Sequence, residues 1–202
     1  ACIDCADGEL PTAVLEVTTT KRVVELLGKP AAYGPCPADS ASEAQSFPLM
    51  SANPRLMCAN ESYLQPDMSG SAVLGFRGVC AFIEKTWVAE ANHAELLIVA
   101  NSGNGVFQMG CVPNFNETTN TTGCEAQIPS LLVENSVGLE LKLLMDTEGP
   151  VSVRLYWRAR NRFDPSLVII WIIAVCTALT ATWWSACNER RAAYDVQAPG
   201  QS

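Results

Sequence analysis

The pattern of apolar and polar positions between residues 75 and 99 is the most informative in the chain, and the other predicted elements can be placed around it. A short apolar run, 72–74, leads into Gly75 and Gly78, and glycines at this spacing permit a sharp turn. Apolar residues then recur at helical spacing, while charged residues fall on the opposite face. The apolar set is Ile83, Trp87, Ala91 and Ala94, and the charged set is Glu84, Lys85 and Glu90. This pattern predicts a strand, a turn and an amphipathic helix that packs on a sheet.

The predicted helix ends at Asn92-His93, because Asn tolerates the left-handed conformation that is common at helix ends. The continuous apolar run 96–99 predicts a short strand buried on both faces. Similar patterns on either side predict further strands and a second helix. The strands are expected at 12–19, 22–27, 71–76, 128–133 and 151–157, and the helix at 135–145 with Asn135 or Ser136 as its N-cap.

Residues 31–53 are rich in Ala, Pro and Ser and show little periodicity. They are expected to form a long surface loop, with a functional or partly helical insert around residues 42–45. Together these elements predict an α+β fold, in which a mixed β-sheet or open barrel carries flanking helices.

An uncharged stretch of 21 residues, 166–186, is long enough to cross a bilayer as a helix. Trp183 and Trp184 stand near its end, where an interfacial aromatic belt is expected. The alternative is the buried core helix of a larger protein than this chain supplies. The stretch therefore predicts one transmembrane helix.

Composition narrows the class of protein. The chain has 202 residues and a net charge of −8, which disfavours a nucleic-acid partner because no basic stripe is available for phosphates. Nine cysteines and the N-x-[ST] sequons at Asn60, Asn116 and Asn120 indicate an oxidising compartment and a glycoprotein. The chain begins at Ala1 without an apolar leader, so a signal peptide is expected to have been removed or not included.

The cysteines suggest two disulfides, although sequence alone leaves the connectivity open. Cys58 and Cys80 flank the strand 71–76, and Cys111 and Cys124 enclose a loop that carries two of the sequons. Three more cysteines, an odd number, are then left over in the N-terminal region, so one of them is free, intermolecular or paired with a removed segment. These are Cys2, Cys5 and Cys36.

The sequence offers no convincing catalytic, cofactor or metal site. The pair Cys2 and Cys5 has the spacing of a redox motif or half a zinc site, but no second pair completes four ligands, so a terminal disulfide is preferred. His93 is the sole histidine, and no nucleophile and carboxylate assemble around it, so it is interpreted as a helix-end residue. No cofactor is expected.

The central residues resemble the protease-associated (PA) domain. The matching pattern is G-x-C-x-F-x-x-K followed by small residues and a buried strand that ends in Asn. It is carried by Gly78, Cys80, Phe82, Lys85, Ala89, Ala91, Ala94 and the segment Leu96–Asn101. The family usually has Gly at the joint between helix and strand, where this chain has Asn92 and His93.

The membrane segment narrows the resemblance to the plant-type signal peptide peptidase-like intramembrane aspartyl proteases. In that family a lumenal PA domain leads into a first helix that ends in a similar Trp-Ser. Other matching pieces are Asn53-Pro54, Gly70-Ser71, Met109–Cys111 and Ile128-Pro129, so the resemblance covers about residues 45–187. It implies catalytic aspartates in YD and GxGD motifs on later membrane helices. Tyr194-Asp195 matches YD in letters only, because it follows the apolar stretch.

The expected domains are a lumenal PA-type ectodomain (1–162, core about 50–157), a transmembrane helix (163–187) and a cytoplasmic tail (188–202). Counting arginines alone would reverse this topology, because more of them precede the helix than follow it. The sequons and cysteines decide in favour of a lumenal or extracellular N-terminal region. We therefore expect a membrane protein of the endomembrane system, in an endosome or vacuole.

The expected function is partner or substrate recognition and membrane anchoring without catalysis, in the N-terminal part of a signal peptide peptidase-like protease. The expected partners are the lipid bilayer and a protein or peptide. Alternatives are a PA-domain cargo (vacuolar sorting) receptor, a fragment of a PA-transmembrane ubiquitin ligase, or a freestanding single-pass glycoprotein. A longer transcript would separate them: further apolar spans with YD and GxGD favour the protease, and a Cys/His-rich zinc ring favours the ligase.

Overall fold

The computed structural model of the chain describes residues 12–59, 67–111, 124–158 and 165–197. It divides into two compact units, 1–159 and 160–202. We call the first the barrel unit and the second the helical unit, and describe each by itself. The sequons Asn60, Asn116 and Asn120 and the pair Cys2 and Cys5 lie outside the described residues.

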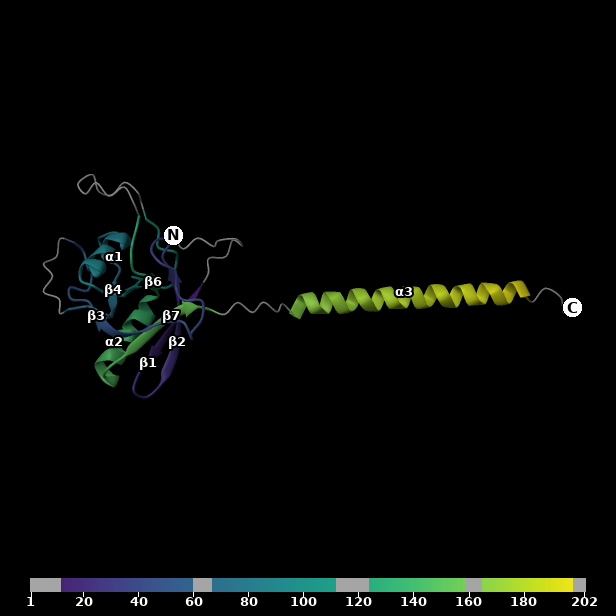
Figure 1. Ribbon diagram of the computed structural model, residues 1–202, viewed down its shortest axis with the longest axis horizontal. Coiled ribbons are helices and arrows are strands. Elements are labelled where there is room, and N and C mark those ends of the chain that lie inside the picture. The colour runs from purple at the N-terminus through teal and green to yellow at the C-terminus, as the bar shows by residue number, and fades with distance from the viewer. Residues whose placement is uncertain (1–11, 60–66, 112–123, 159–164, 198–202) are drawn as a thin grey trace. The chain divides into compact units, whose positions relative to one another are not determined.

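In its described residues the barrel unit contains seven strands, which close in the order β1-β2-β6-β5-β4-β3-β7, and two helices (Figure 1). The strands are β1 (Ala13–Thr18), β2 (Val23–Pro30), β3 (Ser46–Ser51), β4 (Ala72–Phe76), β5 (Leu96–Ala100), β6 (Ser130–Val133) and β7 (Ser152–Trp157). The helices are α1 (Phe82–Ala91) and α2 (Asn135–Glu148). The predicted α+β class with a mixed, barrel-forming sheet is confirmed.

The barrel has a parallel half and an antiparallel half. Strands β3, β4, β5 and β6 are neighbours in parallel register, so their carboxyl ends lie at the same edge. Strand β1 pairs antiparallel with β2 and β7, while β2 meets β6 and β7 meets β3, also antiparallel. These two junctions join the halves into a closed sheet without free edges.

Strand β5 shows how the core is built, because it is buried on both faces as predicted. Its alternate residues Leu96, Ile98 and Ala100 belong to a cluster inside the barrel, which also contains Leu141 and Leu144 of α2. Leu97 and Val99 belong to a second cluster, which contains residues of α1. Since successive strand residues point to opposite faces, α1 and α2 cover opposite sides of the parallel half.

Gly138 allows α2 to approach β5 directly. A Cβ at this position would overlap the Cβ of Ala100, so only glycine fits at this contact. The predicted helix 135–145 is present and extends to Glu148. Its N-cap is Glu134 without a side-chain cap hydrogen bond, so the predicted capping by Asn135 or Ser136 is wrong.

The expectation that residues 31–53 form a loop is wrong for their last third, which forms β3. Phe47 and Leu49 point inward, while Ser46 and Pro48 are exposed, so the segment does alternate. The alternation spans only a few residues and becomes a strand because β4 and β7 supply hydrogen-bonding partners on both sides. Residues 41–43 form a turn rather than a helix.

The predicted faces of α1 need correction at two positions. Lys85 was expected on the polar face but is fully buried, and Ala91 was expected on the apolar face but is exposed. The left-handed residue at the helix end is His93, with φ 61°, whereas Asn92 has φ −100°. Strand β2 also runs past its predicted end at Leu27 to Pro30.

The helical unit contains α3 (Pro165–Gln197). Within it, residues 168–190 are long and apolar enough to cross a membrane, with a mean hydropathy of 1.8 and no residue of that window buried. This finding agrees with the predicted transmembrane helix. Cys176 and Cys187 are exposed free cysteines on α3.

Candidate functional site

The candidate site lies where the parallel strands end. The polar residues that directly follow β4 and β5 are Arg77 and Asn101, and Ser51 ends β3. The carboxyl edge of a parallel sheet is where loops converge and where ligands bind in α/β proteins. Two surfaces at this edge are described below, the Arg77 cluster and the α2 pocket.

The Arg77 cluster consists of Arg77, Phe82, Asn101 and Phe107. The Arg77 guanidinium carbon lies 5.7 Å from the ring centre of Phe82 and 5.2 Å from that of Phe107, close enough for cation–π attraction. The two rings meet edge to face with their centres 5.7 Å apart. Arg77 also donates a hydrogen bond of 3.0 Å to Asn101 Oδ1. The guanidinium is therefore held in place although the residue is exposed.

Asn101 organises the loop that carries Phe107. Its Oδ1 accepts a 2.8 Å hydrogen bond from the amide of Ser102, and its Nδ2 donates a 2.9 Å bond to the carbonyl of Gly105. The residue is buried, and its own amide donates to Val133 at the end of β6. One side chain thus fixes the loop after β5 to the sheet. An Asn suits this position because its amide group can both accept and donate a hydrogen bond to the nearby backbone.

The turn between β4 and α1 is held in place by a disulfide and by a buried lysine. The Cys58–Cys80 disulfide ties it to the preceding loop, and the buried ammonium of Lys85 donates to the carbonyl of Leu56 and lies 3.1 Å from Cys80 Sγ. Val79 stands at the tip of this turn with 92% of its surface exposed. An apolar side chain is therefore presented to solvent on a cross-linked, supported loop.

The α2 pocket opens at the ends of β3 and β4 and has a volume of about 520 Å³. Its lining includes Arg55, Phe76, Leu139 and Lys142. Phe76 packs against the cluster inside the barrel, whereas its neighbour Arg77 stacks on Phe82 of α1 and on Phe107. The end of β4 therefore separates this pocket from the Arg77 cluster.

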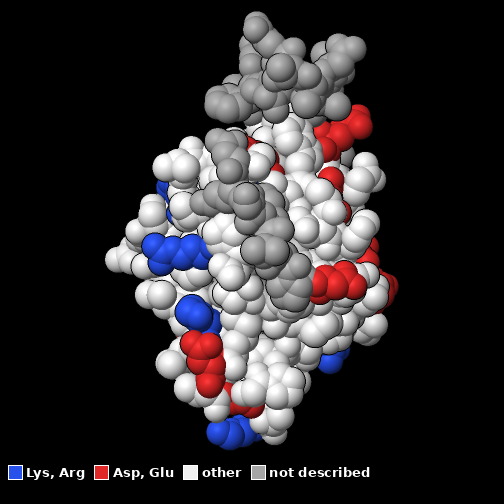
Figure 2. Space-filling model, turned by 90° about the vertical axis from the view of Figure 1, so that its left-hand side faces the viewer, with Lys and Arg blue, Asp and Glu red and all other residues white. Residues whose placement is uncertain are grey.

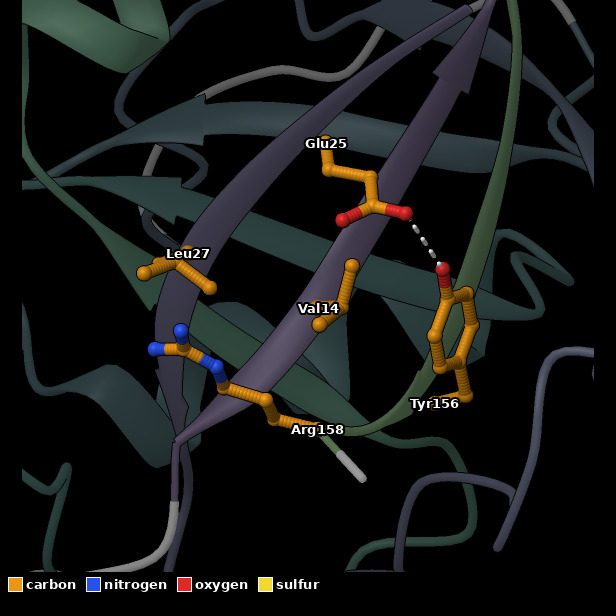
Figure 3. A pocket seen from close by; sticks show the side chains of 5 residues that line it. All are labelled: Val14, Glu25, Leu27, Tyr156 and Arg158. Carbon is orange, nitrogen blue, oxygen red and sulfur yellow. Dashed lines mark hydrogen bonds between the residues drawn. The ribbon is translucent and has the colours of Figure 1, made fainter. Parts of the chain in front are cut away.

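A third surface lies on the antiparallel half and is shown in Figure 3. This tyrosine pocket, of about 400 Å³, is lined by Val14, Glu25, Leu27, Tyr156 and Arg158. Tyr156 points its hydroxyl toward Glu25, with the oxygens 3.5 Å apart, and burial, together with the nearby Glu25 and Glu16 carboxylates, raises the pKa of this phenol. The charged residues that line the pocket, Glu25 and Arg158, are of opposite sign.

A buried polar group underlies α1. The Thr86 hydroxyl lies 3.0 Å from Ser130 Oγ and 3.4 Å from the hydroxyl of Tyr33. Burial raises the pKa of Tyr33 to about 12, and the hydrogen bond from Thr86 acts in the opposite direction. This group joins α1, β6 and the loop after β2, and it serves packing rather than an accessible site.

The face of the barrel unit that points left in Figure 1 is charged unevenly. Figure 2 shows acidic side chains gathered mainly along the right-hand side of this face and basic side chains mainly along its left, where acidic side chains lie next to them toward the bottom. The acidic net charge of the chain is therefore not spread evenly over this face.

The cysteine pairs proposed from the sequence are bonded in the structure as Cys58–Cys80 and Cys111–Cys124. Cys36 is also disulfide-bonded. His93 is exposed directly after α1, in the helix-end position expected for it. Within the described ranges, no group of three or more His, Cys, Asp or Glu could hold a metal ion.

Sequence reasoning did not identify Arg77, Phe107 or Val79 as parts of a site. The signal available was the position of a polar residue directly after a buried strand, between two glycines. Phe107 lies 30 residues from Arg77 in the sequence, so no local pattern could join them. Tyr194-Asp195 falls within the backbone range of α3.

Comparison with known proteins agrees with this architecture. Residues 43–141 match the PA domain family. The chain is 31% identical over 171 residues to signal peptide peptidase-like 2 of Arabidopsis thaliana, covering 85% of this chain and 30% of that protein. It is 32% identical over 173 residues to signal peptide peptidase-like 4 of Oryza sativa subsp. japonica, covering 86% of this chain and 30% of that protein.

A mammalian protein also matches: signal peptide peptidase-like 2A of Mus musculus is 29% identical over 153 residues, covering 74% of this chain and 27% of that protein. The chain thus spans about a third or less of the length of these relatives. The resemblance predicted from the sequence is confirmed. The chain contains a PA domain and is a relative of the signal peptide peptidase-like proteins.

Proposed function

We propose that this chain is the non-catalytic, partner-recognising and membrane-anchoring part of a signal peptide peptidase-like protein. The observation that carries the proposal is the exposure of Val79 and Arg77 on a turn that a disulfide and a buried lysine hold in place. When a partner covers an exposed apolar side chain, apolar surface is removed from water, which favours binding. A loop that is already ordered also loses little conformational entropy on binding.

The proposed contact uses both parts of the turn. Val79 would enter an apolar depression on the partner, while the Arg77 guanidinium would donate to carbonyl or carboxylate oxygens beside it. The rings of Phe82 and Phe107 hold the guanidinium in its orientation, so the side chain is preorganised for this contact. The proposed occupant is a protein or peptide, because its surface can cover the exposed Val79 and reach the Arg77 guanidinium at the same time.

Catalysis is assigned to other parts of the parent protein. An aspartyl protease needs two carboxylates that share a proton around one water molecule. Tyr194-Asp195 follows the apolar stretch, so we propose that it has no catalytic role. The chain reconstituted alone should leave a membrane-spanning peptide intact, and cleavage that disappears in Asp195→Ala would contradict this part.

The proposed topology places residues 1–162 in the lumen of the endomembrane system, in an endosome or vacuole, with α3 crossing the bilayer and 188–202 in the cytoplasm. It rests on the sequons and the disulfides. In microsomes, glycosidase should shift the band, and Asn60→Gln, Asn116→Gln and Asn120→Gln should each reduce the shift. A chain that stays unglycosylated would overturn the topology.

Partner recognition is tested by photo-crosslinking. A benzoylphenylalanine at position 79 in the full chain, expressed in cells, should crosslink to a discrete set of membrane proteins. The same probe at Val23, which is 61% exposed on β2, is the matched control. Adding Arg77→Ala should remove the crosslinks from position 79, and Arg22→Ala should not. Identical products from both probe positions would refute the proposal.

A further inference from the structure

We infer that the α2 pocket binds a short segment of a partner protein in which a carboxylate lies next to an apolar side chain. This inference goes beyond the proposed function, because it concerns a second surface and assigns a ligand chemistry to it. The pocket and the Arg77 cluster lie on opposite sides of the end of β4.

The wall of the pocket on the strand side is fixed by backbone hydrogen bonds. The amide of Ala52 donates to the carbonyl of Leu74 at 2.9 Å, and the amide of Phe76 donates to the carbonyl of Arg55 at 2.8 Å. A Cβ at Gly75 would lie 2.9 Å from Met57 Sδ, so glycine lets this segment lie against β4. The backbone that carries Arg55 is therefore held as an extension of the sheet.

Among the residues that the structure describes, the charged ones that line the pocket are Arg55 and Lys142, and both are cationic. The Arg55 guanidinium carbon lies 5.9 Å from the ring centre of Phe76. Lys142 Nζ lies 3.6 Å from a carboxylate oxygen of Asp146, but the two side chains are 50% and 61% exposed. An exposed pair of this kind contributes little, so Lys142 can turn toward a ligand. In a chain of net charge −8, two cations at one pocket select for an anionic group.

The apolar part of the pocket comes from Leu139 and Phe76. Leu139 is 53% exposed although α2 buries its other face, with Gly138 and Leu141, against the barrel. An apolar side chain that covers Leu139 would remove this surface from water, which is favourable. A carboxylate alone would not use this surface, and an apolar side chain alone would not use the two cations.

These requirements favour a peptide segment over the other classes of ligand. The pocket, at about 520 Å³, is large enough for two neighbouring side chains, and it lies open beside the exposed Asn53 and Ser51, whose polar groups suit a peptide backbone. The tyrosine pocket is the internal comparison. It has similar apolar lining but carries both Glu25 and Arg158, so the same anionic segment gains no net attraction there.

The test uses the full chain in phosphatidylcholine nanodiscs with ¹³C-labelled leucine methyl groups. The probes are the peptide acetyl-Gly-Ser-Leu-Glu-Leu-Ser-Gly-amide and its Gln counterpart, titrated while the Leu139 methyl signals are followed by NMR. The Glu peptide should bind about fivefold more tightly than the Gln peptide, as expected for one partly exposed ionic contact. Raising the salt concentration should weaken the binding of the Glu peptide and leave the binding of the Gln peptide nearly unchanged.

Two variants and a matched control locate the contact. Arg55→Gln and Lys142→Gln together should abolish the difference between the peptides. Leu139→Ser, which lacks the reporter methyl groups and is therefore measured by isothermal titration calorimetry, should weaken the binding of both peptides. Lys21→Gln, which removes an exposed cation from the turn between β1 and β2, should change neither affinity. All variants are checked for unchanged methyl spectra elsewhere in the barrel, so a failure to fold is recognised.

Three outcomes would overturn the inference. They are equal affinities for the two peptides, perturbations at Leu27 of the tyrosine pocket instead of Leu139, and Leu139 shifts that depend on the number of chains per nanodisc, which would indicate a second copy as the occupant. Arg77→Ala should leave peptide binding to the α2 pocket unchanged. The outcome of this test is therefore independent of the crosslinking experiment at position 79.

Discussion

Strands β4, β5 and β6 of the parallel half are buried along nearly their whole length, whereas β2 of the antiparallel half is largely exposed or half-buried. In the parallel half, β4, β5 and β6 are covered by α1 on one face and by the interior cluster on the other. In the antiparallel half, β2 alternates between exposed and half-buried residues, and Val23 and Leu27 face solvent. A strand covered on both faces is expected to tolerate substitution less than one covered on a single face.

The same difference locates the candidate sites. The parallel half ends at one edge, where the connecting segments carry Arg77, Asn101 and Arg55 on backbone that hydrogen bonds tie to the sheet. The antiparallel half offers the tyrosine pocket, whose lining comes from side chains on the strands themselves. The candidate sites of the parallel half therefore lie at the ends of its strands, whereas the tyrosine pocket lies mainly on the strands of the antiparallel half, and the following predictions test the contrast in burial between these regions.

The largest expected effect follows from a cavity in the parallel half. Ile98 is fully buried in β5, and Ile98→Ala should lower the free energy of unfolding by about 2–5 kcal/mol. Val23→Ala on β2 removes exposed methyl groups and should change it by less than about 0.5 kcal/mol. Native-state hydrogen exchange of the β5 amides measures both. Similar effects for the two variants would contradict the proposed difference between the halves.

The next effect concerns the disulfide below the Arg77 cluster. Replacing Cys58 and Cys80 together by Ser should cost about 2–4 kcal/mol, because the loop they close regains freedom in the unfolded state. The double variant avoids leaving a reactive thiol. Cys176→Ser with Cys187→Ser is the matched control, since these cysteines are free, and the same exchange measurement should show no loss. A stable double variant would exclude a supporting role for the bridge.

A smaller effect is expected where α2 meets β5. Gly138→Ala should cost about 1–3 kcal/mol, because the added methyl group overlaps Ala100 and forces the helix away from the strand. Ala has a higher helix propensity than Gly, but this offsets only part of the loss in the free energy of unfolding. Gly103→Ala is the control, since a Cβ there meets no atom within 4 Å. Hydrogen exchange in α2 should accelerate in the first variant alone, and unchanged exchange would rule out the close contact.

The smallest effect appears only at alkaline pH. Above pH 10 the phenol of Tyr33 ionises in the unfolded chain but keeps its proton in the folded chain until about pH 12. The unfolded state then binds fewer protons, so stability falls as pH rises, by about 1.4 kcal/mol per unit in this window. Tyr33→Phe should remove this part of the slope, measured by unfolding between pH 9.5 and pH 11.5 against the unaltered chain. An unchanged slope would mean that Tyr33 is not buried.

The sequence by itself determined the elements whose pattern is local. The helical spacing after Phe82, the apolar run of β5 and the uncharged stretch of α3 each depend on neighbouring residues, and hydrophobic periodicity reports such elements directly. The cysteines that flank β4 also pointed to the bridge across it. Recognition of the PA domain followed from the same central residues.

The tertiary structure decided what depends on pairing between distant residues. Residues 46–51 become β3 because β4 and β7 complete their hydrogen bonds, which no local preference could indicate. Lysine side chains are usually exposed. Lys85 is buried because its ammonium group donates to the carbonyl of Leu56 and lies against the Cys80 sulfur of the nearby disulfide. Arg77 and Phe107 meet because the parallel register of β4 and β5 brings their loops to one edge. Register is set by the closed barrel as a whole, and this is why the candidate sites became visible only in three dimensions.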